Sequence, residues 1–309
     1  QLFAQITNPA IDPIREELVM SLMTFMGNPG NILSEIPQNS RLIKLTNPIL
    51  SNEDLERIQS LNLPEFWTTT LCMGFSAKGD NDLAEAVGQL CRSAEAVVAH
   101  GCSIIVLSDR NLPEDLVPMP ALLAVSAVNR YLIEQGIKSG VDIIVETAEA
   151  REVHHIALLL GYGAAAINPY LAFEIIADLA IRKILVPHIP VTKAIENYID
   201  ALCHGLLKIM SKMGISTLRS YRGAQLFEAI GLSSAVVEQY FTGTASRIEG
   251  IGLEEIAVEA KMRSAAAYEA SPLPLALLSS GGQYRYRRGE ERHLWTPESI
   301  SLLQAATRS

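Results

Sequence analysis

The sequence has 309 residues, of which 49% are hydrophobic and 19% are charged, a composition typical of a globular protein rather than a disordered one. Its formal charge is −9, from 25 basic and 34 acidic side chains, and the only basic cluster lies around Arg285–Arg288. Nucleic acids and anionic membranes are therefore not expected as partners. No apolar run approaches the ~20 residues that a membrane-spanning helix needs.

The cysteines stand singly in the sequence, with no Cys-x-x-Cys pair: Cys72, Cys91, Cys102 and Cys203. This spacing predicts reduced, buried core thiols in a cytosol-like compartment, with neither disulfides nor metal sites. The opening residues Gln-Leu-Phe-Ala-Gln have no basic region followed by an apolar stretch, so no secretory signal is expected.

Residues 1–64 are predicted to form a lead-in segment with two helices. Apolar residues between Ile14 and Phe25 recur at helical spacing and predict a helix over Pro13–Met26, with Pro13 at its start. A loop-rich stretch follows, and a short helix is expected over Asn52–Leu61.

Residues 65–270 alternate between predicted strands and predicted helices. The expected strands are Thr68–Phe75, Ser103–Ser108, Val141–Thr147, Ala164–Asn168 and Ile215–Ser220. The expected helices are Asp82–Ala99, Ala121–Gln135, Glu149–Leu160, Pro169–Ile184, Thr192–Met213, Ala224–Ile230 and Gly252–Ala270.

This alternation predicts an α/β fold with a parallel sheet, either barrel-like or doubly wound. The five strand-helix units fall short of the eight of a full barrel, so we favour an incomplete or distorted (β/α) barrel-like domain. Residues 271–309 are predicted to be an exposed connector, followed by a helix capped near Thr296 with Pro297 at its first position.

Two motifs that suggest chemistry have simpler structural interpretations. His154 and His155 are adjacent on a predicted helix and point about 100° apart, so they cannot chelate one metal together. Gly161-Tyr162-Gly163 resembles a phosphate loop, but its glycines end a helix instead of opening one. We therefore interpret it as a helix C-cap.

Basic residues flank the last predicted strand. Lys212 precedes it, and Arg219 and Arg222 lie at its end near the next helix, where barrels hold phosphates. These three residues are a candidate anion site, and the alternative is a charged rim or domain interface. Polar residues also end two earlier strands, at Asp109–Arg110 and Glu146–Thr147, but we find no nucleophile, base or metal cluster that would complete a catalytic set.

Four long stretches of the chain resemble the central domain of glutamate synthases. They are QLFAQITNPAIDPIREELVMSL from Gln1, HHIALLLGYGAAAINPYLAFE from His154, KIMSKMGISTLRSYRGAQLFEAIGL from Lys208 and HLWTPESISLLQAATR from His293. The resemblance implies a decayed relative of the FMN-binding barrel of the same enzymes. It also implies two neighbouring domains on the same polypeptide, a glutaminase domain and an FMN and 3Fe–4S synthase domain, which together convert glutamine and 2-oxoglutarate into two glutamates.

The resemblance implies no cofactor in this chain. Its first residue is Gln rather than the nucleophilic Cys of the glutaminase domain, and it lacks a cluster-binding cysteine run. In the family, a Thr-Asn pair lies at the entrance of an internal ammonia channel, and the matching residues are Thr7 and Asn8. Pro9 restricts Asn8 to an extended backbone that could line a narrow passage. The alternative is a plain lead-in to a helix capped by Asp12.

Three functional hypotheses follow. The favoured one is a non-catalytic scaffold that walls the ammonia channel in the bacterial cytoplasm or the plastid stroma. The second is a free-standing barrel enzyme or phosphate-ligand binder, and the third is an interaction module that docks through Tyr284–His293. As an isolated chain it is expected to self-associate through exposed apolar surface. The sequence does not specify whether ferredoxin or a nicotinamide nucleotide supplies electrons.

Overall fold

A computed structural model describes most of the chain, namely residues 10–12, 14–31, 33, 41–61, 63–78, 82–185, 189–268, 286–289 and 291–308. The chain divides into two compact units, Gln1–Ser264 and Ala265–Ser309. No helix in these described ranges is long and apolar enough to cross a membrane.

The first unit is built on a four-stranded parallel sheet with the order β3-β5-β7-β8. These strands are Thr68–Cys72, Ile104–Ser108, Asp142–Glu146 and Ala166–Asn168. Every side chain of β5 is buried, which is typical of a parallel strand covered on both faces. The four strands of this sheet lie side by side in the order in which the chain forms them, as in a (β/α) barrel.

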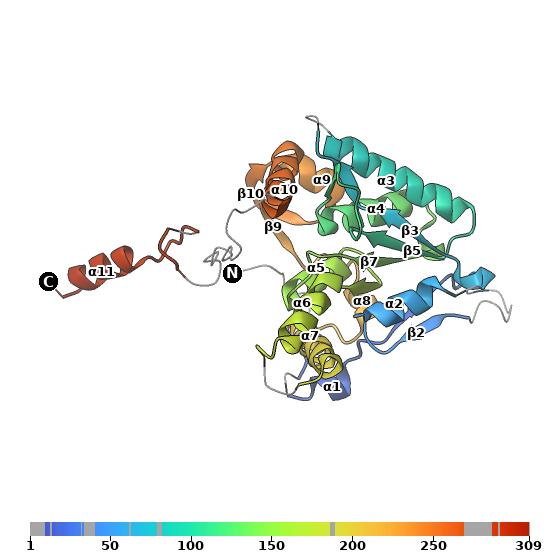
Figure 1. Cartoon of the computed structure of the whole chain (residues 1–309), viewed down its shortest axis with the longest axis horizontal. Coiled ribbons are helices and arrows are strands. Elements are labelled where there is room, and N and C mark those ends of the chain that lie inside the picture. The colour runs from blue at the N-terminus through green and yellow to red at the C-terminus, as the bar shows by residue number, and fades with distance from the viewer. Residues whose placement is uncertain are drawn as a thin grey trace. The chain divides into compact units, whose positions relative to one another are not determined.

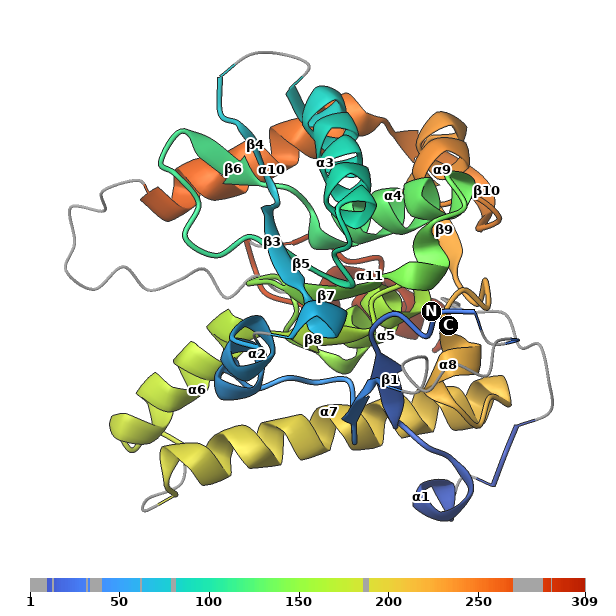
Figure 2. The same ribbon diagram turned by 90° about the vertical axis from the view of Figure 1, so that its right-hand side faces the viewer.

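The crossover helices α3 (Asp82–Ala99), α4 (Ala121–Glu134) and α5 (Val153–Gly161) pack into one core on one face of the sheet. The other face contacts α2 (Asn52–Gln59) and the antiparallel pair β1 (Thr24–Met26) and β2 (Ile43–Leu45). Figures 1 and 2 show α3 and α4 on one side of the sheet and α2 on the other.

This second face corresponds to the interior of a barrel. Met26, Leu50, Leu55 and Ile58 fill it against β5 and β7, and each of these four is at most 5% exposed. The fold is therefore α/β with an incomplete (β/α) barrel, as predicted, and the described residues form no closed barrel. Helix α2 and the pair β1 and β2, all from the lead-in segment, cover this face of the sheet.

The remaining elements surround this half-barrel. In chain order they are α1 (Glu16–Val19), η2 (Pro64–Phe66), β4 (Gly74–Ser76), β6 (Leu116–Pro118), η3 (Lys138–Gly140), α6 (Tyr170–Ile181), α7 (Val191–Met213), α8 (Leu218–Tyr221), β9 (Glu228–Leu232), α9 (Ser234–Tyr240), β10 (Ala245–Ile251) and α10 (Leu253–Tyr268). Strand β4 pairs with β6 in an antiparallel ribbon, and β9 pairs with β10 in a parallel one.

In the second unit, α11 (Pro297–Ala306) begins with a capping box at Thr296 and Pro297 at its first turn, as the sequence predicts. The division into segments 1–64, 65–270 and 271–309 stays a prediction.

Four sequence predictions about elements are wrong. The helix over Pro13–Met26 is a short α1 followed by β1, and the strand over Thr68–Phe75 breaks at Met73 into β3 and β4. The strand over Ile215–Ser220 is mainly α8, and the helix over Ala224–Ile230 gives way to strand β9. Helix formation there is opposed by Gly223 and Gln225, whose φ angles are +71° and +54°.

Candidate functional site

The carboxyl edge of the sheet carries a cluster of buried polar residues. Ser108 ends β5 and Asp109 follows it, Glu146 ends β7 and Thr147 follows it, and Asn168 ends β8. All five residues are at most 8% exposed. In working (β/α) barrels this edge holds the reacting groups. The sequence-predicted pairs Asp109–Arg110 and Glu146–Thr147 therefore do come together.

Asp109 is held by hydrogen bonds from three groups. Its carboxylate accepts from Thr147 Oγ1 at 2.5 Å, from the Ala148 amide at 3.0 Å and from the Tyr170 hydroxyl. Burial outweighs these hydrogen bonds and raises the pKa of Asp109 to about 6. A carboxyl group so enclosed orients the β7–α5 turn.

Glu146 and Arg110 form an ion-pair network beside it. Glu146 accepts from Ser108 Oγ at 2.7 Å and from Arg110 Nη1 at 3.3 Å. Arg110 Nη2 donates to Glu174 at 2.8 Å, and its guanidinium lies 4.9 Å from the ring centre of Tyr170. The charges of Glu146 and Arg110 are thus neutralised within the domain. Through these ion pairs Arg110, which follows β5, connects this strand to β7 and α6.

The same edge connects the sheet to its covering elements. Asn168 Nδ2 donates to the Leu50 carbonyl at 3.0 Å and to Asn52 Oδ1 at 2.9 Å, at the start of α2. Glu149 accepts from the Ala121 amide at 2.7 Å and pairs with Arg263 of α10 at 3.8 Å.

The cysteines and histidines take no part in a metal site within the described ranges. Cys91 and Cys102 are buried as predicted, whereas Cys203 is half-buried and Cys72 is exposed, so the prediction of buried thiols is wrong for these two. Partial burial nevertheless raises the pKa of Cys72. His155 Nδ1 accepts from the Arg151 amide at 3.2 Å, and burial lowers the pKa of this imidazole.

The predicted C-cap is found at Gly161–Gly163, where α5 ends and Gly163 has a φ of +119°. The candidate anion residues are differently engaged. Lys212 on α7 and Arg219 on α8 are exposed, but Arg222 pairs with Asp142 at 3.3 Å and donates to Thr24 Oγ1 at 3.1 Å. Arg222 thus joins β1 to β7, and the anion site stays a prediction.

Thr7 and Asn8 lie outside the described residues. Their place at an ammonia channel stays a prediction.

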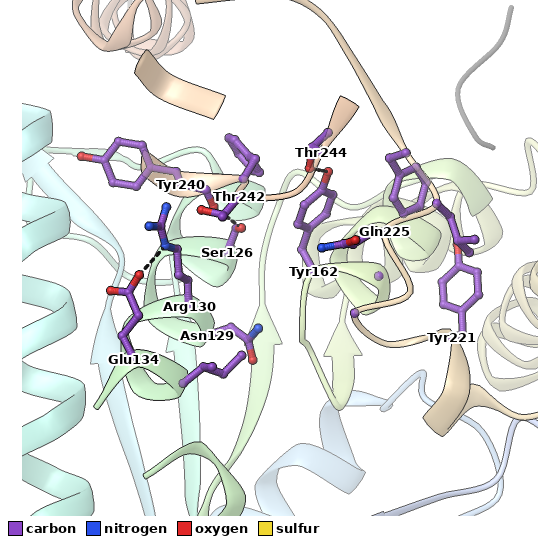
Figure 3. A pocket seen from close by; sticks show the side chains of 16 residues that line it. Ser126, Asn129, Arg130, Glu134, Tyr162, Tyr221, Gln225, Tyr240, Thr242 and Thr244 are labelled. Carbon is purple, nitrogen blue, oxygen red and sulfur yellow. Dashed lines mark hydrogen bonds and ion pairs between the residues drawn. The ribbon is translucent and has the colours of Figure 1, made fainter. Parts of the chain in front are cut away.

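A pocket that the sequence did not predict lies at the other end of α4 (Figure 3). Its volume is about 320 Å³. It is lined by Ser126, Asn129, Arg130, Ile133, Glu134, Gly161, Tyr162, Tyr221, Gly223, Gln225, Leu226, Phe227, Tyr240, Phe241, Thr242 and Thr244. The only sequence signal was the gathering of aromatic residues near positions 221–241 in a chain that is just 6% aromatic.

Aromatic rings form one wall of the pocket. The ring of Tyr162 stacks on Phe227 with centroids 5.7 Å apart and meets Phe241 edge-on at 5.3 Å. The Tyr162 hydroxyl lies 2.8 Å from Thr244 Oγ1, and Figure 3 shows this contact. The rings are thereby fixed in orientation.

The charged residues of the pocket are paired with each other and with backbone. Arg130 Nε donates to Glu134 at 2.7 Å, and Arg130 Nη1 donates to the carbonyls of Glu238 and Gln239 at the end of α9. Ser126 Oγ donates to the Tyr240 carbonyl at 2.5 Å. These bonds attach α9 to α4 and leave the pocket without net charge.

Comparison with known proteins identifies the family. The family model described as glutamate synthase central domain matches residues 1–233. The chain is 44% identical over 308 residues to the large chain of the glutamate synthase [NADPH] of Bacillus subtilis, covering 100% of this chain and 20% of that protein. This chain belongs to the glutamate synthase central domain family.

The central domain also matches other glutamate synthases. It is 40% identical to the glutamate synthase [NADH] of Schizosaccharomyces pombe, over 100% of this chain and 15% of that protein. It is 40% identical to ferredoxin-dependent glutamate synthase 2 of Synechocystis, over 99% of this chain and 20% of that protein. The central domain therefore corresponds to one part of a larger polypeptide, a fifth or less of these relatives.

Solved structures share less with the central domain. The flavin-binding domain of baker's yeast flavocytochrome b2 matches with a TM-score of 0.35 and 17% identity, over 64% of this chain and 45% of that one. A mandelate oxidase variant with an FMN adduct matches with a TM-score of 0.29 and 11% identity, over 72% of this chain and 86% of that one. The fold assignment therefore rests on the strand order of the central domain itself.

Proposed function

We propose that the domain is a non-catalytic scaffold within a glutamate synthase. In this role it connects a glutaminase domain to an FMN and 3Fe–4S synthase domain and helps to wall the passage through which ammonia travels between them. The parent enzyme would convert glutamine and 2-oxoglutarate into two glutamates, with both cofactors held outside this chain.

The observation that carries the proposal is that the charged groups at the carboxyl edge, where a working barrel holds its reacting groups, are paired with one another. The interior face is a packed apolar core that contains Met26, Leu50 and Leu55. At the carboxyl edge, Glu146 and Arg110 neutralise each other. Such an edge supports a structural role because its charged groups are held in place by internal partners.

A free-standing phosphate binder is less well supported. Its best candidate cation, Arg222, has only 17% of its side chain exposed and pairs with Asp142. A phosphate would have to compete with this carboxylate for the guanidinium.

The channel role is tested in the intact glutamate synthase with Asn8→Gly. Glycine frees the backbone that Pro9 otherwise restrains, so ammonia is expected to escape, and glutamine hydrolysis should exceed 2-oxoglutarate consumption. The matched control is Ala10→Gly, at an exposed position, which should keep the two rates equal. Equal rates in both variants would contradict the channel role.

The scaffold role is tested on the purified chain. We expect a colourless protein that unfolds cooperatively and catalyses neither glutaminase activity nor glutamate formation. A flavin absorption spectrum or measurable turnover would overturn it.

A further inference from the structure

We propose that the pocket between α4, the end of α5 and residues 221–244 is a binding site for an uncharged, planar heteroaromatic molecule of about nucleobase size. The site is independent of the scaffold role. Its volume of about 320 Å³ falls at the lower end of the range for small-molecule sites.

The shape of the pocket favours a flat ligand. Tyr162, Phe227 and Phe241 hold one another in fixed orientations, and Tyr221 and Tyr240 add two further rings to the lining. Aromatic walls bind planar ring systems by stacking and edge contacts.

Two carboxamides provide the hydrogen-bonding groups. The side chain of Asn129 packs directly against Gly163, because a Cβ atom on residue 163 would lie only 2.3 Å from Asn129 Cγ. The side chain of Gln225 packs in the same way against Gly243, where a Cβ atom would lie 2.1 Å from Gln225 Nε2. Each carboxamide therefore packs against a glycine. Within the described part of the chain neither carboxamide has a hydrogen-bond partner. A carboxamide offers both donors and an acceptor, which suits the edge of a heteroaromatic ring.

The backbone of Gln225 is an independent sign of function. Its φ of +54° is unusual for a residue other than glycine, and such backbone strain concentrates at ligand sites. The left-handed conformation places this carboxamide in the pocket lining shown in Figure 3.

The absence of free charge in the lining decides the class of ligand. Arg130, which is the cation of the pocket lining, is bound to Glu134 and to the carbonyls that end α9. A phosphate or carboxylate would have to break these bonds, whereas an uncharged ring would not.

The test is a titration of the full 309-residue chain with adenine, cytosine and nicotinamide, followed by calorimetry and by thermal unfolding. Indole is the matched control because it has a flat ring with only one donor. We expect at least one of the three probes to raise the unfolding temperature and to bind about tenfold more tightly than indole.

Two variants remove the proposed ligand contacts: Asn129→Leu, which keeps the side-chain shape, and Gln225→Gly. Each is expected to weaken binding about tenfold. Gln225→Gly should nevertheless fold at least as stably as the parent, because glycine adopts a positive φ without strain.

Lys183→Gly is the matched backbone control. Lys183 also has a positive φ, +58°, but lies at the end of α6 outside the pocket, so this change should leave binding unaltered. Three outcomes would overturn the proposal: no probe binds at millimolar concentration, indole binds as tightly as the probes, or Asn129→Leu and Gln225→Gly keep the parent affinity.

Discussion

At the scale of single residues, the carboxyl edge of the sheet depends on Asp109. Its carboxylate orients Thr147 and the Ala148 amide, and burial raises its pKa from 3.8 to about 6. A carboxyl group whose pKa is higher in the folded chain than in the unfolded chain binds protons more tightly when folded. Its contribution to stability is therefore fully present below pH 3.8 and is lost as the pH rises through about 6.

Asp109→Asn removes this dependence. The unfolding free energy of the variant minus that of the parent should increase by about 3 kcal/mol as the pH rises from about 4 to about 8. This figure follows from a pKa that folding raises by roughly two, at about 1.4 kcal/mol for each pKa unit. Urea unfolding of both proteins across this range measures the difference, which cancels the titration of other carboxylates. Tyr170→Phe is the companion variant. It removes a hydrogen bond that lowers the pKa of Asp109, so the transition should move to higher pH. A constant difference between parent and Asp109→Asn would contradict the prediction.

At the scale of elements, the sequence predicts secondary structure best where the apolar residues fit only one periodicity. The continuous apolar runs of β5 and β7 and the long amphipathic α7 are predicted to within a few residues. Residues 13–26 fit two patterns. Helical spacing joins Ile14 and Leu18, which are 90% and 78% exposed, whereas the residues that are buried, Met20 to Met26, alternate with period two like a strand.

The site residues that could be predicted are those on the correctly predicted strands. Asp109 and Glu146 come together because β5 and β7 are parallel neighbours that end at one edge, with Ser108 paired to Glu146. The pocket joins α4 to residues 221–244, about a hundred positions later, and α9 and β9 within that stretch were not predicted. Tertiary packing alone brings these walls together.

The filling of the barrel interior by α2 gives a test at this scale. Leu55 is 2% exposed and packs against the inner face of the sheet, so Leu55→Ala should lower the unfolding free energy by about 2–5 kcal/mol. Arg57→Ala on the same helix has a side chain that is 72% exposed and should change it by only about 0.5 kcal/mol. Chemical denaturation of both variants measures the contrast. Equal effects would mean that α2 lies on the sheet without supporting it.

At the scale of the whole molecule, the surface of the first unit carries an unusual parallel ribbon. Ile230 of β9 and Ile248 of β10 are direct cross-strand partners, and they are 61% and 57% exposed. Parallel strands are normally covered on both faces, and a two-stranded sheet is only marginally stable by itself. An apolar pair on such a ribbon is a site where another surface is expected to pack.

The isolated chain is therefore expected to self-associate through this ribbon. Ile248→Lys places a charge on it and should shift the monomer–oligomer equilibrium toward monomer, because burying an unpaired ammonium group in the contact is costly. Sedimentation velocity over a range of protein concentrations measures this shift. Leu63→Lys, at a position 48% exposed and outside the ribbon, adds the same charge and should leave association unchanged. If both variants dissociate equally, net charge rather than the ribbon governs association, and a parent chain that stays monomeric at every concentration would contradict the prediction altogether.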